Sequence, residues 1–103
     1  MNIDIKSVHF EISDELKDFI DKKLHRIDYA KDLIVDLLLT LTKEKMRYKL
    51  EANINFRWNY SSHIKVTSFD QFEGIDKFID KLERKIRKEK DKIKDHSAAK
   101  GIV

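Results

Sequence analysis

The sequence predicts an α+β domain in which two helices pack on one face of a four-stranded sheet, in the order β-α-β-β-β-α. Residues 48–58 alternate between apolar and polar side chains, which is typical of a strand with one buried face. Residues 14–28 and 71–94 repeat apolar side chains at helical spacing. A chain of 103 residues suits one domain with one modest core.

The N-terminal half predicts a strand, a helix and a second strand. Ile3 and Ile5 alternate with polar neighbours, as in a short strand. Ser13 is a suitable N-cap for a helix over 14–28, and the acids that follow it suit the helix dipole. Period-two apolar spacing and β-branched side chains favour a strand over a helix at 35–42. Its inward side chains are expected to be Val35, Leu37, Leu39 and Leu41.

The second half predicts two strands and a long helix. The segments are a turn at 43–47, a strand at 48–58, a hairpin loop at 59–62, a strand at 63–68 and a helix at 71–94. Asp70, three residues before Glu73, resembles a capping-box start for this helix. Because the strand 48–58 has one apolar and one polar face, we expect an antiparallel sheet with a single covered face. We expect one domain over residues 1–96 and a flexible tail over 97–103.

Composition argues against several function classes. The chain has no cysteine and only two glycines, so disulfides, thiol catalysis, cysteine zinc sites and a glycine-rich phosphate loop are not expected. Its four histidines lack metal-ligand spacing, and no carboxylate pair stands out as an acid/base dyad. No apolar run approaches the ~20 residues of a membrane helix. We therefore expect a cytoplasmic protein that is not an enzyme, with no cofactor, no metal and no membrane partner.

Charge is concentrated near the C-terminus. Residues 80–96 hold eight lysines and arginines against five acids, which accounts for the whole formal charge of +3. A helical projection turns by ~100° per residue around the helix axis, and we count its angles from Ile75 on the apolar stripe. The acids Asp76, Asp80 and Glu83 then fall at roughly 80–140°, with Arg87 among them. The bases at roughly 180–260° are Lys77, Lys81, Arg84, Lys88 and Lys92.

This segregation has two interpretations. Like-charge neighbours at i,i+4 destabilise a helix slightly, a cost that a bound polyanion would offset. Alternatively, the bases form a solvated face whose lysines suit the helix C-terminus. The helix at 14–28 adds bases off its own apolar stripe, so two adjacent helices could form one basic surface that contacts phosphates of structured RNA. These bases are Lys17, Lys22, Lys23 and Arg26.

Trp58 and Tyr60 flank the hairpin loop at 59–62 and allow a stacking platform for bases. The favoured interpretation is that Trp58 ends the apolar face of its strand and Tyr60 packs across the hairpin.

Three segments together resemble a known family. "FDQFEGIDKFIDKLERKIRKEKDKIKDH" (69–96) is similar to the second helix of the ribosome hibernation promoting factors and ribosome-associated translation inhibitors, also called the sigma-54 modulation family. "LTKEKMRYKLEANINF" (41–56) is similar to the family's central hairpin, and "ISDELKDFIDKKLHRI" (12–27) to its first helix. The resemblance covers residues 1 to about 96 in the family's order of elements.

The resemblance implies a fold similar to double-stranded RNA-binding domains. It also implies a function: occlusion of the mRNA and tRNA channel of the small ribosomal subunit, at the A and P sites, in stress or stationary phase. The 16S rRNA would be the direct partner. The positions that match the family's basic contacts are Lys23, Arg26, Lys81, Arg84 and Lys88. Further positions are Lys22, Lys77, Arg87 and Lys92.

The sequence also departs from the family. The loop at 58–62 lacks the Pro/Gly turn of many relatives. A second, dimerising domain and an acidic tail are absent from this sequence, which is similar to the short promoting type. The resemblance implies that this type can act with a separate small ribosome-dimerising factor. We expect the chain itself to be a monomer. Two alternatives remain: a general double-stranded RNA-binding module, and a protein-interaction helix that dimerises through residues 75–93.

Overall fold

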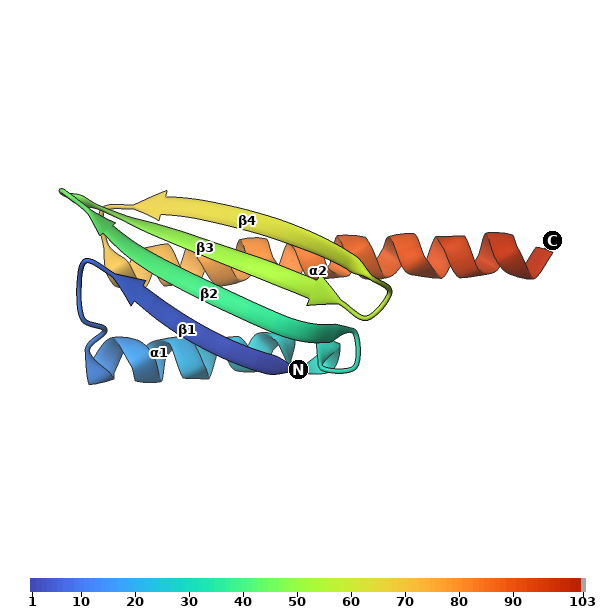
Figure 1. Cartoon of the computed structure of the whole chain (residues 1–103), viewed down its shortest axis with the longest axis horizontal. Coiled ribbons are helices and arrows are strands. Elements are labelled where there is room, and N and C mark those ends of the chain that lie inside the picture. Colours follow the sequence, from blue (N-terminus) through green and yellow to red (C-terminus); the bar gives the residue numbers. More distant parts are fainter. Residues whose placement is uncertain (103) are drawn as a thin grey trace.

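The computed structural model describes the backbone of residues 1–102 and the side chains of residues 1–92. The elements are β1 (Asn2–Val8), α1 (Asp14–Leu24), the 3-10 helix η1 (His25–Ala30), β2 (Ile34–Glu44), β3 (Arg47–Phe56), β4 (Tyr60–Ser68) and α2 (Gln71–Ile102) (Figure 1). The predicted β-α-β-β-β-α order and α+β class are confirmed. The side chains of the predicted tail, residues 97–103, lie outside the described residues, so that prediction stays untested.

The four strands form one sheet in the order β1-β2-β3-β4. The β2–β3 and β3–β4 pairs are antiparallel, but β1 pairs with β2 in parallel. The expectation of an antiparallel sheet was therefore wrong for β1. The physical reason is the crossover: the chain returns through α1 before it enters β2, and such a connection joins parallel strands.

The strand β2 is irregular at its start. The pairing of β2 with β3 shifts register between Ile34 and Asp36, and Val35 at this shift is 45% exposed. The prediction that Val35 faces inward was wrong, because a bulge puts two residues where the partner strand has one. Ile34 takes the inward position instead, and Leu37, Leu39 and Leu41 are buried as predicted.

Both helices begin at the predicted caps. The Ser13 Oγ accepts a hydrogen bond from the Leu16 N–H at 3.1 Å. Asp70 Oδ1 accepts from the Phe72 N–H at 2.8 Å and the Glu73 N–H at 3.3 Å. The first helix, predicted as one unit over 14–28, instead tightens into η1 at His25, where positions three apart share a face.

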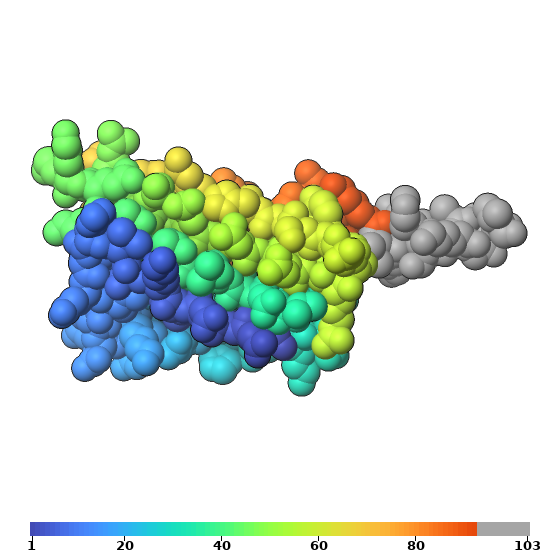
Figure 2. All heavy atoms as spheres, in the orientation of Figure 1, coloured from blue at the N-terminus to red at the C-terminus, as the bar shows by residue number. Residues whose placement is uncertain are grey.

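Two layers enclose the core. Both helices cover one face of the sheet, whereas the opposite face is open and the β2–β3 turn protrudes at one end (Figures 1 and 2). The α2 stripe is fully buried against the strands and consists of Ile75, Phe78, Ile79, Leu82 and Ile86. Each such side chain contributes about 1.5–3 kcal/mol by leaving water. Because the sheet of the same chain covers this stripe, these five side chains are not available to a second helix.

The β3–β4 hairpin is tighter than predicted. β4 starts at Tyr60, so the turn comprises residues 57–59, with Asn59 in the left-handed region at φ 64°. The rings of Trp58 and Tyr60 both stack on Phe56, with centroids 4.8 and 6.0 Å away. This geometry agrees with the packing interpretation of the two rings.

Candidate nucleic-acid interface

A basic groove lies between α2 and the edge strand β4. It has a volume of about 280 Å³. Its lining is Ile64 of β4 with Lys81, Arg84, Lys85 and Lys88 of α2. The groove therefore combines one apolar side chain with four cations and no carboxylate, a composition that attracts phosphate groups.

Two bases of this groove, Lys81 and Arg84, donate hydrogen bonds to backbone carbonyls rather than to acids. Lys81 Nζ donates to the Lys65 carbonyl oxygen at 2.9 Å, which also satisfies one acceptor on the free edge of β4. Arg84 Nε donates to the Asp80 carbonyl oxygen at 3.4 Å. Among the described side chains, Lys81, Arg84 and Lys88 form no ion pair with a carboxylate. Their positive charges are thus available to an anionic partner.

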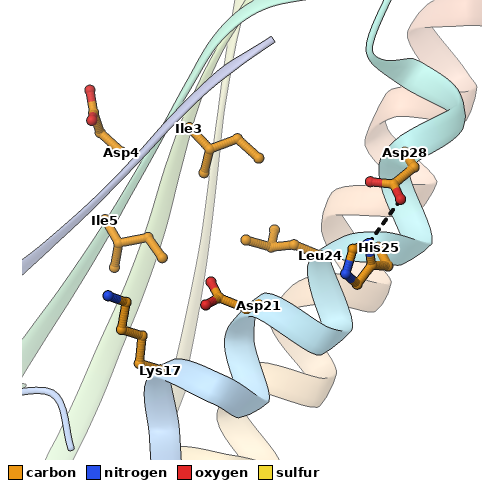
Figure 3. Close-up of a pocket in the computed structure, with 8 residues that line it drawn as sticks. All are labelled: Ile3, Asp4, Ile5, Lys17, Asp21, Leu24, His25 and Asp28. Carbon is orange, nitrogen blue, oxygen red and sulfur yellow. Dashed lines mark hydrogen bonds and ion pairs between the residues drawn. The ribbon is translucent and has the colours of Figure 1, made fainter. Parts of the chain in front are cut away.

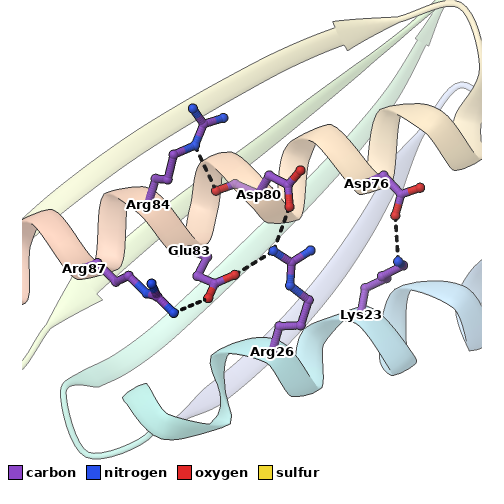
Figure 4. A network of polar contacts seen from close by, with 7 residues as sticks. All are labelled: Lys23, Arg26, Asp76, Asp80, Glu83, Arg84 and Arg87. Carbon is purple, nitrogen blue, oxygen red and sulfur yellow. Dashed lines mark hydrogen bonds and ion pairs between the residues drawn. The ribbon is translucent and has the colours of Figure 1, made fainter.

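The acidic strip of α2 faces the first helix and its 3-10 extension (Figure 4). Lys23 Nζ lies 2.8 Å from Asp76 Oδ1. Arg26 Nη2 lies 2.7 Å from both Asp80 Oδ1 and Glu83 Oε2. We call this set of ion pairs the interhelix seam.

The seam changes the expected basic surface. The two helices lie side by side, but acids of α2 neutralise Lys23 and Arg26, so the bases of α1 and α2 do not merge into one uninterrupted surface. The pKa of Arg26 is raised, first by its hydrogen bond to Asp80 and next by the bond to Glu83. Because the side chain of Arg26 is 40% exposed, solvent screens these pairs, and they act mainly to position the helices.

Arg87 lies one turn after Glu83, the last acid of the interhelix seam. Its Nη2 lies 2.9 Å from Glu83 Oε1. Its guanidinium carbon lies 5.9 Å from the centre of the Tyr29 ring. The pKa of Arg87 is raised, chiefly by the Tyr29 hydroxyl and then by the charge of Glu83. Arg87 therefore belongs to the α1/η1 side of α2, away from the β4 groove.

The remaining predicted contacts are scattered. Lys22 is exposed on α1. Lys77 pairs with Glu73 at 3.1 Å, and Lys92 pairs with Glu89 at 3.5 Å. Of the nine predicted bases, the structure brings Lys81, Arg84 and Lys88 together in one groove.

Two residues at the groove were not among the predicted site residues. Lys85 lines the groove and lies 3.2 Å from Glu89, whose side chain is only 4% exposed. The signal for Lys85 was its spacing of four from Lys81, which places both on one helix face. The signal for Glu89 was its position three residues after Ile86 on the apolar stripe.

A larger groove, of about 520 Å³, separates β1 from α1 (Figure 3). Apolar side chains and both signs of charge line it, including Lys17, Asp21 and the pair His25–Asp28, whose Nδ1 and Oδ2 are 2.9 Å apart. This mixture does not concentrate charge of one sign, so the groove is not the candidate site. Within the described residues, no cluster of three or more ligand side chains could hold a metal ion. The same part of the chain contains no helix apolar and long enough to cross a membrane.

The fold and the groove together define a class of protein: a small α+β domain that presents a phosphate-attracting helix face beside a sheet edge. Comparison with known proteins makes the class specific. The profile of the family described as "Sigma 54 modulation protein / S30EA ribosomal protein" matches residues 3–94, and the chain belongs to this family.

Three relatives illustrate the similarity. The chain is 30% identical over 96 residues to the ribosome hibernation promoting factor of Klebsiella oxytoca. This alignment covers 93% of this chain and 100% of that protein. A ribosomal subunit interface protein from Coxiella burnetii superposes with a TM-score of 0.78 at 27% identity, covering 87% and 98% of the two chains. The N-terminal domain of Thermus thermophilus Protein Y, at 24% identity, shares the fold, with a TM-score of 0.71 and coverage of 85% and 98%.

Proposed function

We propose that this protein is a cytoplasmic ribosome hibernation factor. It binds 16S rRNA of the small ribosomal subunit in the mRNA and tRNA channel, at the A and P sites, and thereby inhibits translation during stress or stationary phase. The observation that carries the proposal is the groove with Lys81, Arg84 and Lys88, whose charges have no carboxylate partner among the described side chains. The relatives named as hibernation promoting factors and as a subunit interface protein support the ribosome as the partner.

The groove acts by neutralising phosphates. Lys81, Arg84 and Lys88 are spaced three and four residues apart, so they form a row of about 10 Å along α2 at 1.5 Å per residue. A row of this length can meet neighbouring phosphates of one RNA strand, and each neutralised phosphate releases condensed counterions. Occupancy of the channel then excludes mRNA and tRNA by volume, and no bond is made or broken.

The other predicted bases have supporting roles in this proposal. Lys22 adds positive charge on α1, whereas Glu73 and Glu89 offset part of the charge of Lys77 and Lys92. Lys23 and Arg26 contact RNA at the edge of the seam while they hold α1 against α2 through Asp76 and Asp80. A separate small ribosome-dimerising factor is a further partner that the family resemblance allows.

Two other functions compete with this proposal. A general double-stranded RNA-binding module would use the same groove but would bind any RNA duplex equally well. A dimerising helix is disfavoured because the α2 stripe through Ile86 packs on the sheet of the same chain. A monomeric mass in solution is expected.

Sedimentation with 30S subunits tests the proposal. The wild-type protein should co-sediment, tRNA and mRNA should displace it, and an unrelated RNA duplex should compete poorly. The variant with Lys81→Glu, Arg84→Glu and Lys88→Glu should remain in the supernatant and should lose inhibition of cell-free translation, with little change in melting temperature. Co-sedimentation of this variant at wild-type levels would refute the proposal, and equal competition by any duplex would favour the general module.

A further inference from the structure

A second cationic feature lies at the far end of the interhelix seam, around Tyr29. The Tyr29 side chain is 44% exposed, although η1 buries its neighbours Ile27 and Ala30 completely. These two anchors are three residues apart and share the inward face of the 3-10 turn. The ring of Tyr29 is therefore held outward by packing on either side of it in the sequence.

Arg26 and Tyr29 are also three residues apart, and so they share a second face of η1, different from the inward face of Ile27 and Ala30. Arg26 contacts Asp80 and Glu83 of α2, whereas Tyr29 lies beside Arg87 and Lys90, about one turn further along the same helix. The α2 face that meets α1 and η1 thus changes from acidic to basic between Glu83 and Arg87. Where the charge of α2 changes sign, η1 supplies an aromatic ring instead of a cation.

The two cations stay at the outer limit of contact with this ring. Arg87 Cζ is 5.9 Å and Lys90 Nζ is 5.8 Å from the ring centre, whereas cation–π attraction acts within about 6 Å. The attraction between cations and ring is therefore weak. Among the described side chains Lys90 forms no ion pair, whereas Arg87 is held by Glu83, with 2.9 Å between Nη2 and Oε1. An open groove of about 410 Å³ separates the groups, with Asp91 as its fourth lining residue.

An exposed ring flanked by two cations matches the chemistry of an unstacked nucleotide, although Glu83 offsets part of the charge of Arg87. Bases stack on aromatic side chains irrespective of sequence, and nearby cations bind the attached phosphates. Asp91 in the same groove repels a phosphate placed beside it but can accept a hydrogen bond from a base amino group. We propose that Tyr29, Arg87 and Lys90 form a binding site for one unpaired RNA nucleotide, with the base on Tyr29 and its phosphate on the two cations.

This inference rests on the proposed function and refines it. The β4 groove binds phosphates and so does not distinguish a paired from an unpaired base, whereas the Tyr29 site requires a base that is free to leave its stack. Together the two sites would favour helical RNA with a bulged or looped-out nucleotide over a continuous duplex.

Two RNA hairpins test the site, identical except that one carries a single unpaired adenosine. We expect the wild-type protein to bind the bulged hairpin about 5- to 150-fold more tightly than the paired one, the range that corresponds to about 1–3 kcal/mol for one stacked base. Tyr29→Leu should remove this preference and leave binding of the paired hairpin unchanged, because it retains an apolar side chain but no stacking surface. Tyr29→Phe should keep the preference. Tyr60→Leu is the matched control, since Tyr60 is similarly exposed at 40% but lies in β4.

The outcomes separate this site from the proposed function. Equal wild-type binding of the two hairpins, or a preference that survives Tyr29→Leu, would overturn the inference. Neither result depends on ribosomes. Failure of the proposed function would appear instead in the sedimentation assay, as undiminished 30S binding by the groove variant. Thermal melting of each variant checks that the fold is retained.

Discussion

Arg26 of η1 reaches across to Asp80 of α2, with 2.7 Å between guanidinium Nη2 and carboxylate Oδ1. The same nitrogen also binds Glu83, so one cation of η1 joins two successive turns of α2 (Figure 4). Lys23 and Asp76 repeat this arrangement one turn earlier. The seam therefore aligns the two helices along their length and leaves Lys81, Arg84 and Lys88 on the side of α2 that faces β4.

The first prediction separates positioning from direct contact. Arg26→Ala should lower the affinity for the 30S subunit less than Arg84→Ala does, because Arg26 is occupied by two acids and Arg84 lies in the groove. Arg26→Ala should also give the larger fall in melting temperature. Quantitative sedimentation and thermal melting measure both effects, with Lys6→Ala, on an exposed lysine of β1, as control. An equal loss of affinity at both arginines would show that Arg26 is a main RNA contact.

The second prediction concerns salt. If three groove bases each neutralise one phosphate, the logarithm of the binding constant should fall with the logarithm of salt concentration at a slope of about −2 to −3. Lys88→Ala should reduce the steepness by about 0.7–0.9. Lys6→Ala, on an exposed lysine of β1, should leave the slope unchanged. A slope that does not respond to Lys88→Ala would place the phosphate contacts elsewhere.

The third prediction compares two phenylalanines of α2. Phe78 is fully buried, so Phe78→Ala should cost about 3–5 kcal/mol of unfolding free energy. Phe72 is 40% exposed and stacks on Phe19 with ring centres 5.2 Å apart, so Phe72→Ala should cost less: about 0.5–1.5 kcal/mol for the ring pair, in addition to the loss of its partial burial. Urea denaturation measures both changes. Similar losses at the two positions would contradict the packing of α2 on the sheet.

The fourth prediction uses a buried hydroxyl. Among the described side chains, the Ser62 Oγ is buried and has no hydrogen-bond partner. Ser62→Ala should therefore leave stability unchanged or raise it by about 1 kcal/mol, because an unsatisfied buried group is removed. Ser61→Ala is the matched control, since its Oγ donates to Asn55 Oδ1 at 2.7 Å on the exposed face. Destabilisation by Ser62→Ala beyond that of Ser61→Ala would indicate an internal water bound at Ser62.

Hydrophobic periodicity accounts for the parts of the fold that were predicted correctly. The alternation over 48–58 and the stripe from Ile75 to Ile86 each determine which side chains are buried. Periodicity does not indicate the direction of a strand relative to its neighbour, and so the parallel pairing of β1 was missed. It also contains no sign of the bulge at Val35 or of the tightening at His25, because neither involves proline or glycine.

The candidate site, like the fold, could be predicted only in part from the sequence. Helical projection separated the acids from the bases of α2, but it could not show which neighbour each strip faces. That depends on how α1 lies against α2, and the contact of Arg26 with Asp80 settles the direction. Family resemblance predicted Lys23 and Arg26 as RNA contacts, and their ion pairs with α2 became visible only in three dimensions.

The fifth prediction concerns Glu89, the buried acid beside the groove. Glu89 lies 3.2 Å from Lys85 and 3.5 Å from Lys92, so its charge offsets two cations of the binding helix. Glu89→Gln keeps the size of the side chain but releases both lysines, and we expect tighter 30S binding at low salt with a steeper salt dependence. The free energy of unfolding should fall by about 1.5 kcal/mol, which is the low end of the range for hydrogen bonds to charged groups. We expect the low end because water can solvate both lysines once the carboxylate is gone.

Glu11→Gln makes the same change of charge outside the helices and the sheet, so it isolates the effect of position from that of net charge. It should change 30S affinity much less than Glu89→Gln does. Equal gains from the two variants would mean that overall charge alone governs binding. A loss of affinity with Glu89→Gln would show instead that the carboxylate holds Lys85 in the orientation that the RNA requires.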